Sequence, residues 1–477
     1  MGAAAIFYEC ASGASSRPLG CGYRRREPEK TVLHEVVRGN LSTFLAECAD
    51  GGGLPRFVVR DFERYLDCGI LAKGFARVAC TKCKDELLVG FSCKGRGVCP
   101  SCSARRAHDA AIHLVANVLP VAPYRQWTLS FPIGLRFALA KDSQLFSEVL
   151  RLFVRAVFAF LRKRARALGV SKPQPGAVAF LQRFGSALQL TPHIHLLALE
   201  GVFAKGEGGS LSFCPLPPPD DEEVESLLRR VALRVVALLR QCGKLEEVGT
   251  QEDALDFLRA AATRTERLPL KLDAAPPCRR RCAFLEGFSL HAATWVHENN
   301  RDGLERLANY GARGPLSLER LSLLPSGEVA YRMKRPNTAG AQVLVLQPVA
   351  FLRKLATLVP PPRVNLTRFF GVLAPRAKSR RQVVPQPTSE APPQVDVDSL
   401  GVAPSLATAP SAPSPTWTRV PWAELLKRTF EHPTNCMSRP GDDRASPHHP
   451  PVSSAAWTGT RLRGTPAALG RGTRLLP

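Results

Sequence analysis

The stretch QRFGSALQLTPHIHLLALEGVF, residues 182–203, decides how the chain is expected to fold. Apolar residues dominate from His193 to Phe203, a run typical of a buried strand. The segment from Ala177 to Gln189 has a similar character. The two segments are therefore predicted to form neighbouring strands, joined by a short turn at Thr191–Pro192.

Two histidines stand at the start of the second strand. Residues i and i+2 of a strand point to the same face, so His193 and His195 project together while Ile194 points away. This geometry suits two ligands of one divalent ion: imidazole binds Mn²⁺ and Zn²⁺, and carboxylates and water can complete a Mg²⁺ site. The alternative is a pair of ordinary polar histidines on a strand.

The cysteines form a second pattern. Cys80 and Cys83 make one C-x-x-C pair, and Cys99 and Cys102 make another after 15 intervening residues. Two such pairs predict a structural zinc site, because four thiolates fill a tetrahedral ion and leave no open position. Cys68 and Cys93 lie nearby and either replace a member of a pair or are buried thiols. Reduced cysteines packed in a core are the competing interpretation.

Periodicity elsewhere predicts a mixture of helices and strands, an α+β fold. Two short helices are expected within residues 31–65, and further helices from residue 103 and over 143–168, 220–240 and 302–310. Strands are expected over 124–132 and within 329–348. Past about Pro375, Pro, Ser and Thr dominate, which predicts a disordered tail.

The chain is strongly basic, with a formal net charge of +24 over 477 residues. Such a charge favours a polyanionic partner, DNA or RNA, over a merely solvated basic surface. No segment has the pattern of a signal peptide or a membrane span, which predicts a cytoplasmic protein whose thiols stay reduced.

Tyr310 is one of six tyrosines and ends a polar helix, RDGLERLANYGARGP, between Arg306 and Arg313. A phenol needs a neighbouring cation or metal to act as a nucleophile. From its position alone, Tyr310 is better interpreted as a packing residue.

Several long motifs occur in a fixed order. They are CGILAKGFARVACTKC, FSCKGRGVCPSCSARRA, YRQWTLSFP, the HIH strand, the Tyr310 helix with GPLSLERL, and NLTRFFGVLAPRAKSR. Over roughly residues 24–380 the chain resembles the rolling-circle transposases of the insertion-sequence family numbered ninety-one. This resemblance implies an HUH endonuclease core, an antiparallel sheet flanked by helices, after a small helical zinc-ribbon domain. The expected divisions are 1–30, a leader; 31–118, zinc- and DNA-binding; 119–375, catalytic; and 376–477, the tail.

The resemblance also assigns roles. It implies that Cys80, Cys83, Cys99 and Cys102 hold structural zinc, that His193 and His195 hold catalytic Mg²⁺ or Mn²⁺, and that Tyr310 is the nucleophile. HUH enzymes need a third metal ligand, for which His291 is the first candidate, with Gln182 and Glu305 behind it. Some relatives have a second tyrosine four positions on, where this chain has Gly314, so a single-tyrosine enzyme is expected.

The implied activity is nicking of single-stranded DNA at element ends through a 5′-phosphotyrosine link, with transfer to a target and without a nucleotide cofactor. DNA contacts are expected from basic residues of both domains: Lys94, Arg96, Arg105, Arg106, Arg306 and Arg313. The enzyme is expected to associate with the nucleoid and with no membrane. Two alternatives stay open: a non-catalytic zinc-ribbon DNA-binding protein (a decayed transposase), and a metal-dependent hydrolase that uses water.

Overall fold

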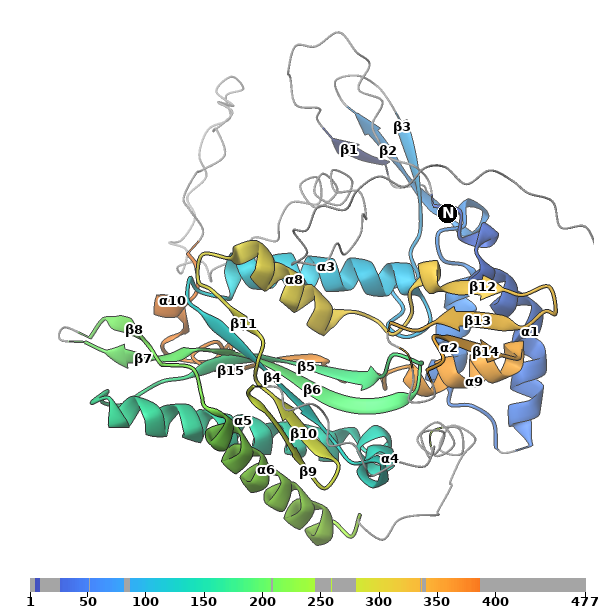
Figure 1. Cartoon of the computed structure of the whole chain (residues 1–477). Helices are drawn as coiled ribbons and strands as arrows, with labels where there is room; N and C mark the ends of the chain where they lie inside the picture. The colour runs from blue at the N-terminus through green and yellow to red at the C-terminus, as the bar shows by residue number, and fades with distance from the viewer. Residues whose placement is uncertain are drawn as a thin grey trace, which may run out of the picture.

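An antiparallel sheet of seven strands forms the centre of the computed structural model (Figure 1). Its strands follow the order β15 (Thr367–Gly371), β5 (Gly176–Phe184), β6 (Leu190–Leu199), β4 (Tyr124–Ser130), β10 (Phe288–His291) and β9 (Cys282–Leu285), and β11 (Trp295–Val296) pairs with the far end of β4. The structure describes residues 5–8, 26–50, 52–80, 86–206, 209–244, 259, 280–334, 336 and 340–386. Cys83 and the greater part of the predicted tail lie outside these residues. The expected α+β class, with an antiparallel sheet flanked by helices, is confirmed.

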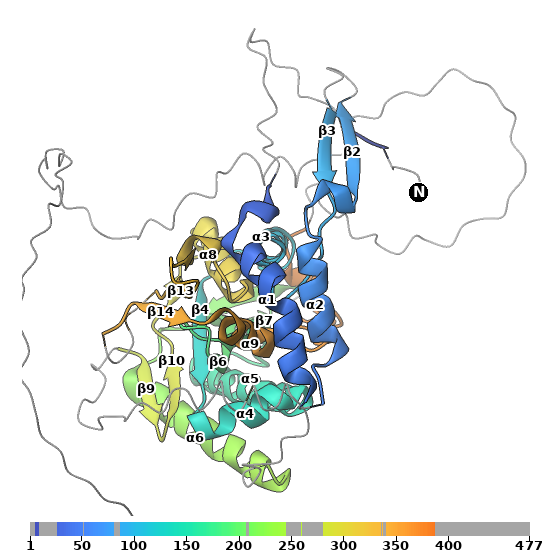
Figure 2. The same ribbon diagram turned by 90° about the vertical axis from the view of Figure 1, so that its right-hand side faces the viewer.

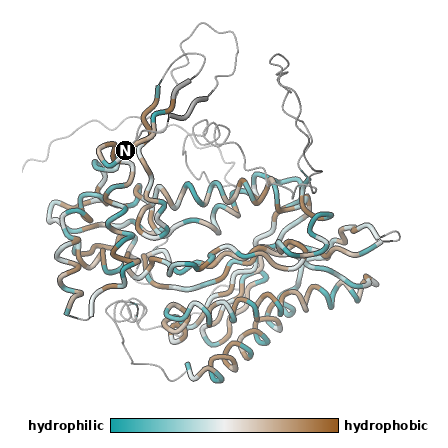
Figure 3. The backbone as a smooth tube through the Cα atoms, turned by 180° about the vertical axis from the view of Figure 1, so that it is seen from behind, coloured by the Kyte–Doolittle hydropathy of each residue, from teal (hydrophilic) through white to brown (hydrophobic). Residues whose placement is uncertain are grey.

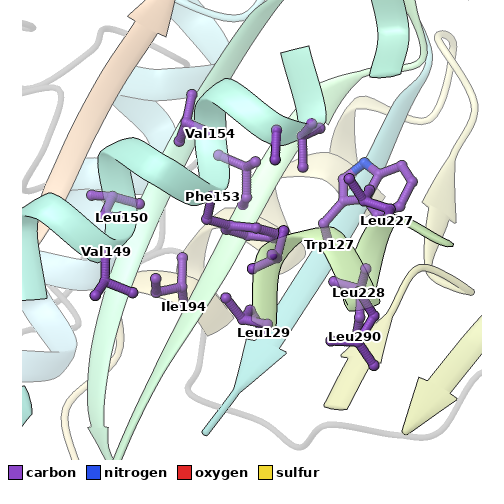
Figure 4. Close-up of a cluster of buried hydrophobic side chains, with 14 of the residues drawn as sticks. Trp127, Leu129, Val149, Leu150, Phe153, Val154, Ile194, Leu227, Leu228 and Leu290 are labelled. Carbon is purple, nitrogen blue, oxygen red and sulfur yellow. The ribbon is translucent and has the colours of Figure 1, made fainter. Parts of the chain in front are cut away.

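The two faces of the sheet are covered by different helices. Leu129, Ile194 and Leu196 point to the face that packs against α4 (Ile133–Lys141), α5 (Ser143–Ala167) and α6 (Asp221–Gln241), and this face forms the largest hydrophobic core (Figure 4). The helices α3 (Pro100–Asn117) and α8 (Arg301–Ala312) cover the other face. Seen from behind in Figure 3, hydrophobic and hydrophilic segments alternate along α5 and α6, as expected for helices with one buried side.

Local signals explain the helix starts. The Asp142 side chain accepts hydrogen bonds from the backbone N–H groups of Gln144 and Leu145 at the start of α5. Asp220 and Glu223 form a reciprocal capping box at the start of α6. Such caps satisfy backbone donors that the first turn leaves unpaired, and each stabilises a helix by about 1 kcal/mol. The predicted helices over 143–168 and 220–240 therefore form within one or two residues of their expected ends.

The turn between β5 and β6 differs from the prediction. It spans Gly185 to Gln189, where Gly185 N–H donates to the Gln189 carbonyl and Leu188 adopts a positive φ of 56°. The register shifts between the pairs Gln182–His193 and Phe184–Leu190, so Thr191 and Pro192 together face one residue of β5. They form a β-bulge, in which a proline without an N–H group is tolerated inside a strand.

The N-terminal and C-terminal parts of the described chain share a second core. Helices α1 (Val32–Ala49) and α2 (Arg56–Leu66) pack with α9 (Pro348–Leu358) and with the small sheet of β12 (Leu321–Leu323), β13 (Val329–Arg332) and β14 (Val343–Leu346). A hairpin of β2 (Phe75–Cys80) and β3 (Glu86–Gly90) projects from this region, with β1 (Ala5–Tyr8) parallel to β2 (Figure 2). A second hairpin, β7 (Gly201–Lys205) with β8 (Leu211–Pro215), extends from the end of β6.

No helix among the described residues combines the length and apolar character that a membrane span needs.

Candidate active site and zinc cluster

Two rows of side chains cross the face of the central sheet that α3 and α8 cover. The strand registers align Gln182, His193, Ser130, Ser289 and Phe284 in one row. The next row contains Phe180, His195, Thr128, His291 and Cys282. Directly opposed residues of antiparallel strands point to the same face, with Cβ atoms about 5 Å apart. His193 and His195 therefore project together, as the spacing predicts, and Gln182 lies beside His193.

Helix α8 brings Tyr310 to the histidines. The ring centroid of Tyr310 lies 5.6 Å from that of His195, which in turn lies 4.9 Å from that of His193. The Asn300 side chain caps the helix at Gly303, and Arg301 donates to the carbonyls of Val115, Leu119 and Pro120 at the end of α3. These contacts fix the start of α8 against α3.

Gln182 joins the end of α8 to the sheet. Its side-chain amide donates to the carbonyls of Tyr310 at 2.8 Å and Gly311 at 2.9 Å. Close packing at this point requires glycine, because a Cβ at Gly311 would lie 2.5 Å from the Phe180 ring. Sheet and helix are thus held in contact next to the tyrosine.

Hydrogen bonds orient both imidazoles. His193 Nδ1 lies 2.8 Å from the Thr191 carbonyl, which only accepts, so Nδ1 bears the proton and Nε2 keeps its lone pair. His195 Nδ1 accepts from the side-chain N–H of Gln126 at 2.9 Å and lies 3.1 Å from the Thr128 hydroxyl. Donation from the second ring nitrogen, as His193 makes to Thr191, is typical of metal-ligating histidines.

Burial keeps these histidines neutral. Desolvation lowers the pKa of His193 to about 4, opposed by the hydrogen bond to Thr191. Desolvation and the neighbouring His193 lower the pKa of His195 to about 3. Two polar atoms here are buried without a hydrogen-bond partner: His195 Nε2 and Gln182 Oε1. Gln182 Oε1 and His193 Nε2 offer lone pairs, and His195 Nε2 offers one in the tautomer whose Nδ1 donates to the Thr128 hydroxyl, so the residues fit a bound cation.

Cations surround the tyrosine. The Arg313 guanidinium carbon lies 4.4 Å from the centroid of the Tyr310 ring, and Lys334 Nζ lies 5.6 Å from it. Partial desolvation and the charges of Arg313 and Arg320 lower the pKa of Lys334 to about 8. Lys334 was not predicted, because nothing in the sequence links this residue of the loop after β13 to α8.

The first candidate for a third ligand, His291, lies elsewhere. Strand β4 separates it from β6, and its Nδ1 contacts Cys282 Sγ at 3.1 Å. Within the described part of the chain, the histidine pair and His291 form no group whose ligand atoms lie within 4.8 Å of one another. Glu305 stands five residues before Tyr310 on α8 and likewise joins no such group.

Four thiols meet at the base of the β2–β3 hairpin. The ligand atoms of Cys68, Cys93, Cys99 and Cys102 lie within 4.8 Å of one another, and all four residues are buried. Two of them, Cys99 and Cys102, belong to the predicted set. Cys68 and Cys93 take the other two places among the described residues, which is the alternative in which these nearby cysteines replace members of a pair.

The hairpin explains this difference. Its base is closed by hydrogen bonds between Phe91 and both Gly69 and Gly74, so the residues just before and just after it meet. Cys80 ends β2 at the opposite end, about 20 Å away at 3.3 Å per residue. The side chain of Cys80 and all of Cys83 are outside the described residues.

The charge of the thiol cluster is partly balanced. Arg26 donates to Cys68 Sγ at 3.2 Å, and the backbone N–H groups of Cys93 and Gly95 donate to cysteine sulfurs. Four cysteines in contact match the ligand set of a structural zinc ion.

The expected DNA-contacting residues occupy three places. Arg96 donates to the carbonyls of Pro361 and Val364, between α9 and β15, and Arg106 donates to those of Lys94 and Gly95, next to Cys93. Arg105 pairs with Asp109 on α3. On α8, Arg306 is exposed, whereas Arg313 follows the helix and lies over Tyr310 and Phe184.

The end of α8 admits one tyrosine. The position four residues after Tyr310 is Gly314, beyond the last helical residue, Ala312. A Cβ there would lie 2.6 Å from the Ser103 Cβ, so no larger side chain fits.

Comparisons with known proteins agree with this arrangement. Residues 38–131 match the family model described as "Transposase zinc-binding domain", and residues 176–381 match the one described as "Putative transposase". No curated protein and no solved structure matches the chain. The two matched regions contain the thiol cluster and the His193–His195–Tyr310 site, respectively. The chain therefore belongs to the transposases in which a zinc-binding domain, of the type found in insertion-sequence family ninety-one, precedes the transposase domain.

Proposed function

We propose that this transposase nicks one strand of DNA with Tyr310 and drives rolling-circle transposition. The observation that supports this most directly is the convergence of three side chains: Tyr310 lies against His195, and His195 against His193. A DNA-binding protein without catalysis needs no tyrosine between two cations beside a pair of neutral histidines.

The reaction follows from this arrangement. The phenolic oxygen of Tyr310 attacks phosphorus, a Tyr–O–P bond forms, and the bond from phosphorus to the 3′ oxygen breaks. The phenol gives up its proton and the departing 3′ oxygen takes one up, so the products are a 5′-phosphotyrosine and a 3′-hydroxyl. Arg313 and Lys334 stabilise the negative charge that develops on the phenolic oxygen and the phosphate. Because the covalent link conserves the phosphodiester energy, strand transfer needs no nucleotide cofactor.

His193, His195 and Gln182 would hold a divalent cation, Mg²⁺ or Mn²⁺. When bound, this cation supplies positive charge to the scissile phosphate. Gln182 replaces His291 as the preferred third ligand, because Gln182 pairs directly with His193 and its Oε1 is buried without a partner. The Thr191 carbonyl, Gln126 and Thr128 would keep the imidazoles oriented.

A nicking assay tests the nucleophile. Labelled single-stranded DNA with the element's own ends is incubated with wild type or Tyr310→Phe in Mg²⁺ or Mn²⁺ and separated on a denaturing gel. We expect a covalent protein–DNA band with wild type and none with Tyr310→Phe, while the buried Tyr331→Phe behaves as wild type. Cleavage that survives in Tyr310→Phe would favour a hydrolase that uses water. Binding without cleavage would favour the non-catalytic protein.

The third ligand is tested by paired variants. Gln182→Ala is expected to raise the Mn²⁺ concentration needed for half-maximal nicking by at least tenfold, whereas His291→Ala leaves it unchanged. The reverse result would return His291 to the site. Gln182 also holds α8, and Gln182→Glu separates the two roles: it retains an oxygen ligand but loses both N–H donors to the carbonyls of Tyr310 and Gly311. It should therefore keep the wild-type Mn²⁺ requirement while nicking more slowly.

A further inference from the structure

A cavity of about 330 Å³ lies next to Tyr310, between the zinc-binding region and the catalytic sheet. Its walls come from α3, from the end of β5, from the residues that follow α8, and from the segment between α9 and β15. The cavity lies beyond the end of the β15–β5 pairing. Thr367 and Phe180 form the terminal pair there. The volume is in the range of small-molecule sites in proteins.

The cavity is cationic. Arg96, Arg106, Arg183 and Arg313 line it, and none of its described lining residues is acidic. Arg96 and Arg106 donate to backbone carbonyls, which orient a guanidinium without cancelling its charge. Four positive charges around one cavity favour an anionic ligand.

Two of these arginines have unused donors. Arg183 is buried, with 5% of its surface exposed, and donates from Nη2 to the Ala140 carbonyl, while its Nε has no hydrogen-bond partner. The Nε of Arg313 is also buried without a partner. Buried donors of this kind are normally satisfied, so they indicate a missing acceptor such as a phosphate oxygen.

The remaining walls are largely apolar and suit a nucleobase. Leu181, Phe184 and Leu366 contribute side chains, and Asn365 adds an amide that can read a base edge. The Arg313 guanidinium lies 5.3 Å from the centroid of the Phe184 ring, so a cation and an aromatic surface stand together. Stacking surfaces beside arginines are typical of sites for single-stranded nucleic acid.

Arg313 connects this cavity to the tyrosine, because it lines the cavity and lies over the Tyr310 ring. We propose that the cavity holds one unstacked nucleotide of the DNA strand, next to the phosphate that Tyr310 attacks. The nucleotide's phosphate contacts the arginines, and its base lies against the apolar wall. This inference rests on the proposed function and names the part of the substrate that the site selects.

The strand has a path onward. A second hollow, of about 860 Å³, shares Arg96 and Pro360 with the first. Its lining is basic on balance: Arg56, Arg60, Arg64 and Lys94 join Arg96, against Asp61 and Glu63. The nucleotide pocket thus leads from the tyrosine to a basic surface of the zinc-binding region.

The test combines a protein variant with a scan of the DNA. Asn365→Asp places a carboxylate in the cavity at nearly constant size, and the Asn365 side chain is exposed, which favours normal folding. Gln144→Glu makes the same change in charge on the exposed first turn of α5, across the sheet. Affinity is measured by fluorescence anisotropy on single-stranded oligonucleotides of the element's end, with an abasic residue at each position in turn.

For wild type and Gln144→Glu, we expect an abasic residue at one position beside the nick to weaken binding about tenfold. Asn365→Asp should weaken binding of the intact oligonucleotide by a similar factor, with no further loss from the abasic residue at that position. The proposal would be overturned if abasic residues at every position weakened binding equally. It would also be overturned if the effects of Asn365→Asp and of the abasic residue beside the nick were fully additive.

Two controls keep the result interpretable. Zinc content and thermal unfolding verify that Asn365→Asp is folded, and Arg106→Gln, at another wall of the cavity, should give the same loss of position dependence. Binding is measured without added Mg²⁺ or Mn²⁺, so it does not depend on nicking. If Asn365→Asp and the abasic residue are non-additive but no nicking occurs, the pocket is supported and the nuclease is not. If nicking occurs and the two changes are additive, the nuclease is supported and the pocket is not.

Discussion

The Arg313 guanidinium lies over two aromatic rings, 4.4 Å from the centroid of Tyr310 and 5.3 Å from that of Phe184. A planar guanidinium is suited to such stacking, which the ammonium group of lysine does not reproduce.

Arg313→Lys should reduce nicking about 100-fold, because lysine retains the charge and loses the planar contact with both rings. Arg306→Lys makes the same change on the exposed side of α8 and should leave the rate within about twofold of wild type. Single-turnover nicking measures both variants. Equal rates for Arg313→Lys and wild type would show that charge alone suffices.

Cys68→Ser should abolish zinc binding and lower the melting temperature, because zinc-bound thiolates stabilise small domains strongly. Cys80→Ser, at the far end of the hairpin, should retain the zinc of this cluster. Metal analysis of the purified variants separates the two ligand sets. Zinc loss in Cys80→Ser with retention in Cys68→Ser would restore the set predicted from the C-x-x-C spacing.

Acid should destabilise the protein through His195. Burial lowers the pKa of His195 from 6.5 to about 3, so below pH 6.5 the unfolded chain binds a proton that the folded protein does not. The free energy of unfolding is therefore highest above pH 6.5 and falls as the pH is lowered towards 3. The total loss is a few kcal/mol, since one pKa unit corresponds to about 1.4 kcal/mol.

Urea unfolding at a series of pH values measures this loss. His195→Gln should show a shallower decline with acid than wild type. Loss of zinc affects both proteins, so the difference between their profiles isolates the histidine. Parallel profiles would mean that His195 is protonated in the folded protein.

Gly311→Ala should slow nicking more than it weakens DNA binding. The added methyl group would clash with the Phe180 ring and displace the end of α8, at a cost of about 1–3 kcal/mol in the free energy of unfolding. Gly134→Ala is the control, because a Cβ there meets nothing within 4 Å. That helical substitution in α4 should be neutral or slightly stabilising. A wild-type nicking rate in Gly311→Ala would show that the position of α8 tolerates adjustment.

The sequence predicted those parts of the site that depend on local periodicity. His193 and His195 share a face because strands alternate, and the helix that ends near Tyr310 forms where polar and apolar residues alternate at helical spacing. Their meeting was suggested by the resemblance to a family, not by either segment. It depends on Arg301 and Gln182, whose contacts are with residues distant in the chain.

Two ligand expectations depend on how the strands pair. A C-x-x-C pair favours ligands that are adjacent in sequence, but the β2–β3 hairpin has Cys80 at the far end of β2 and brings Cys68 and Cys93 together at its base. His291 is likewise on the expected kind of strand, yet one strand too far across the sheet. Both positions follow from strand pairing, which spacing along the chain does not specify.

Because no second tyrosine fits at position 314, the number of DNA ends that one copy of the chain can hold covalently is limited. With Tyr310 as the nucleophile, each copy of the chain holds one DNA end at a time. An event that cuts two ends must therefore pass through the same tyrosine in succession or recruit a second copy. A rate of complete transfer that rises with the first power of protein concentration indicates succession, and a second-power dependence indicates a pair.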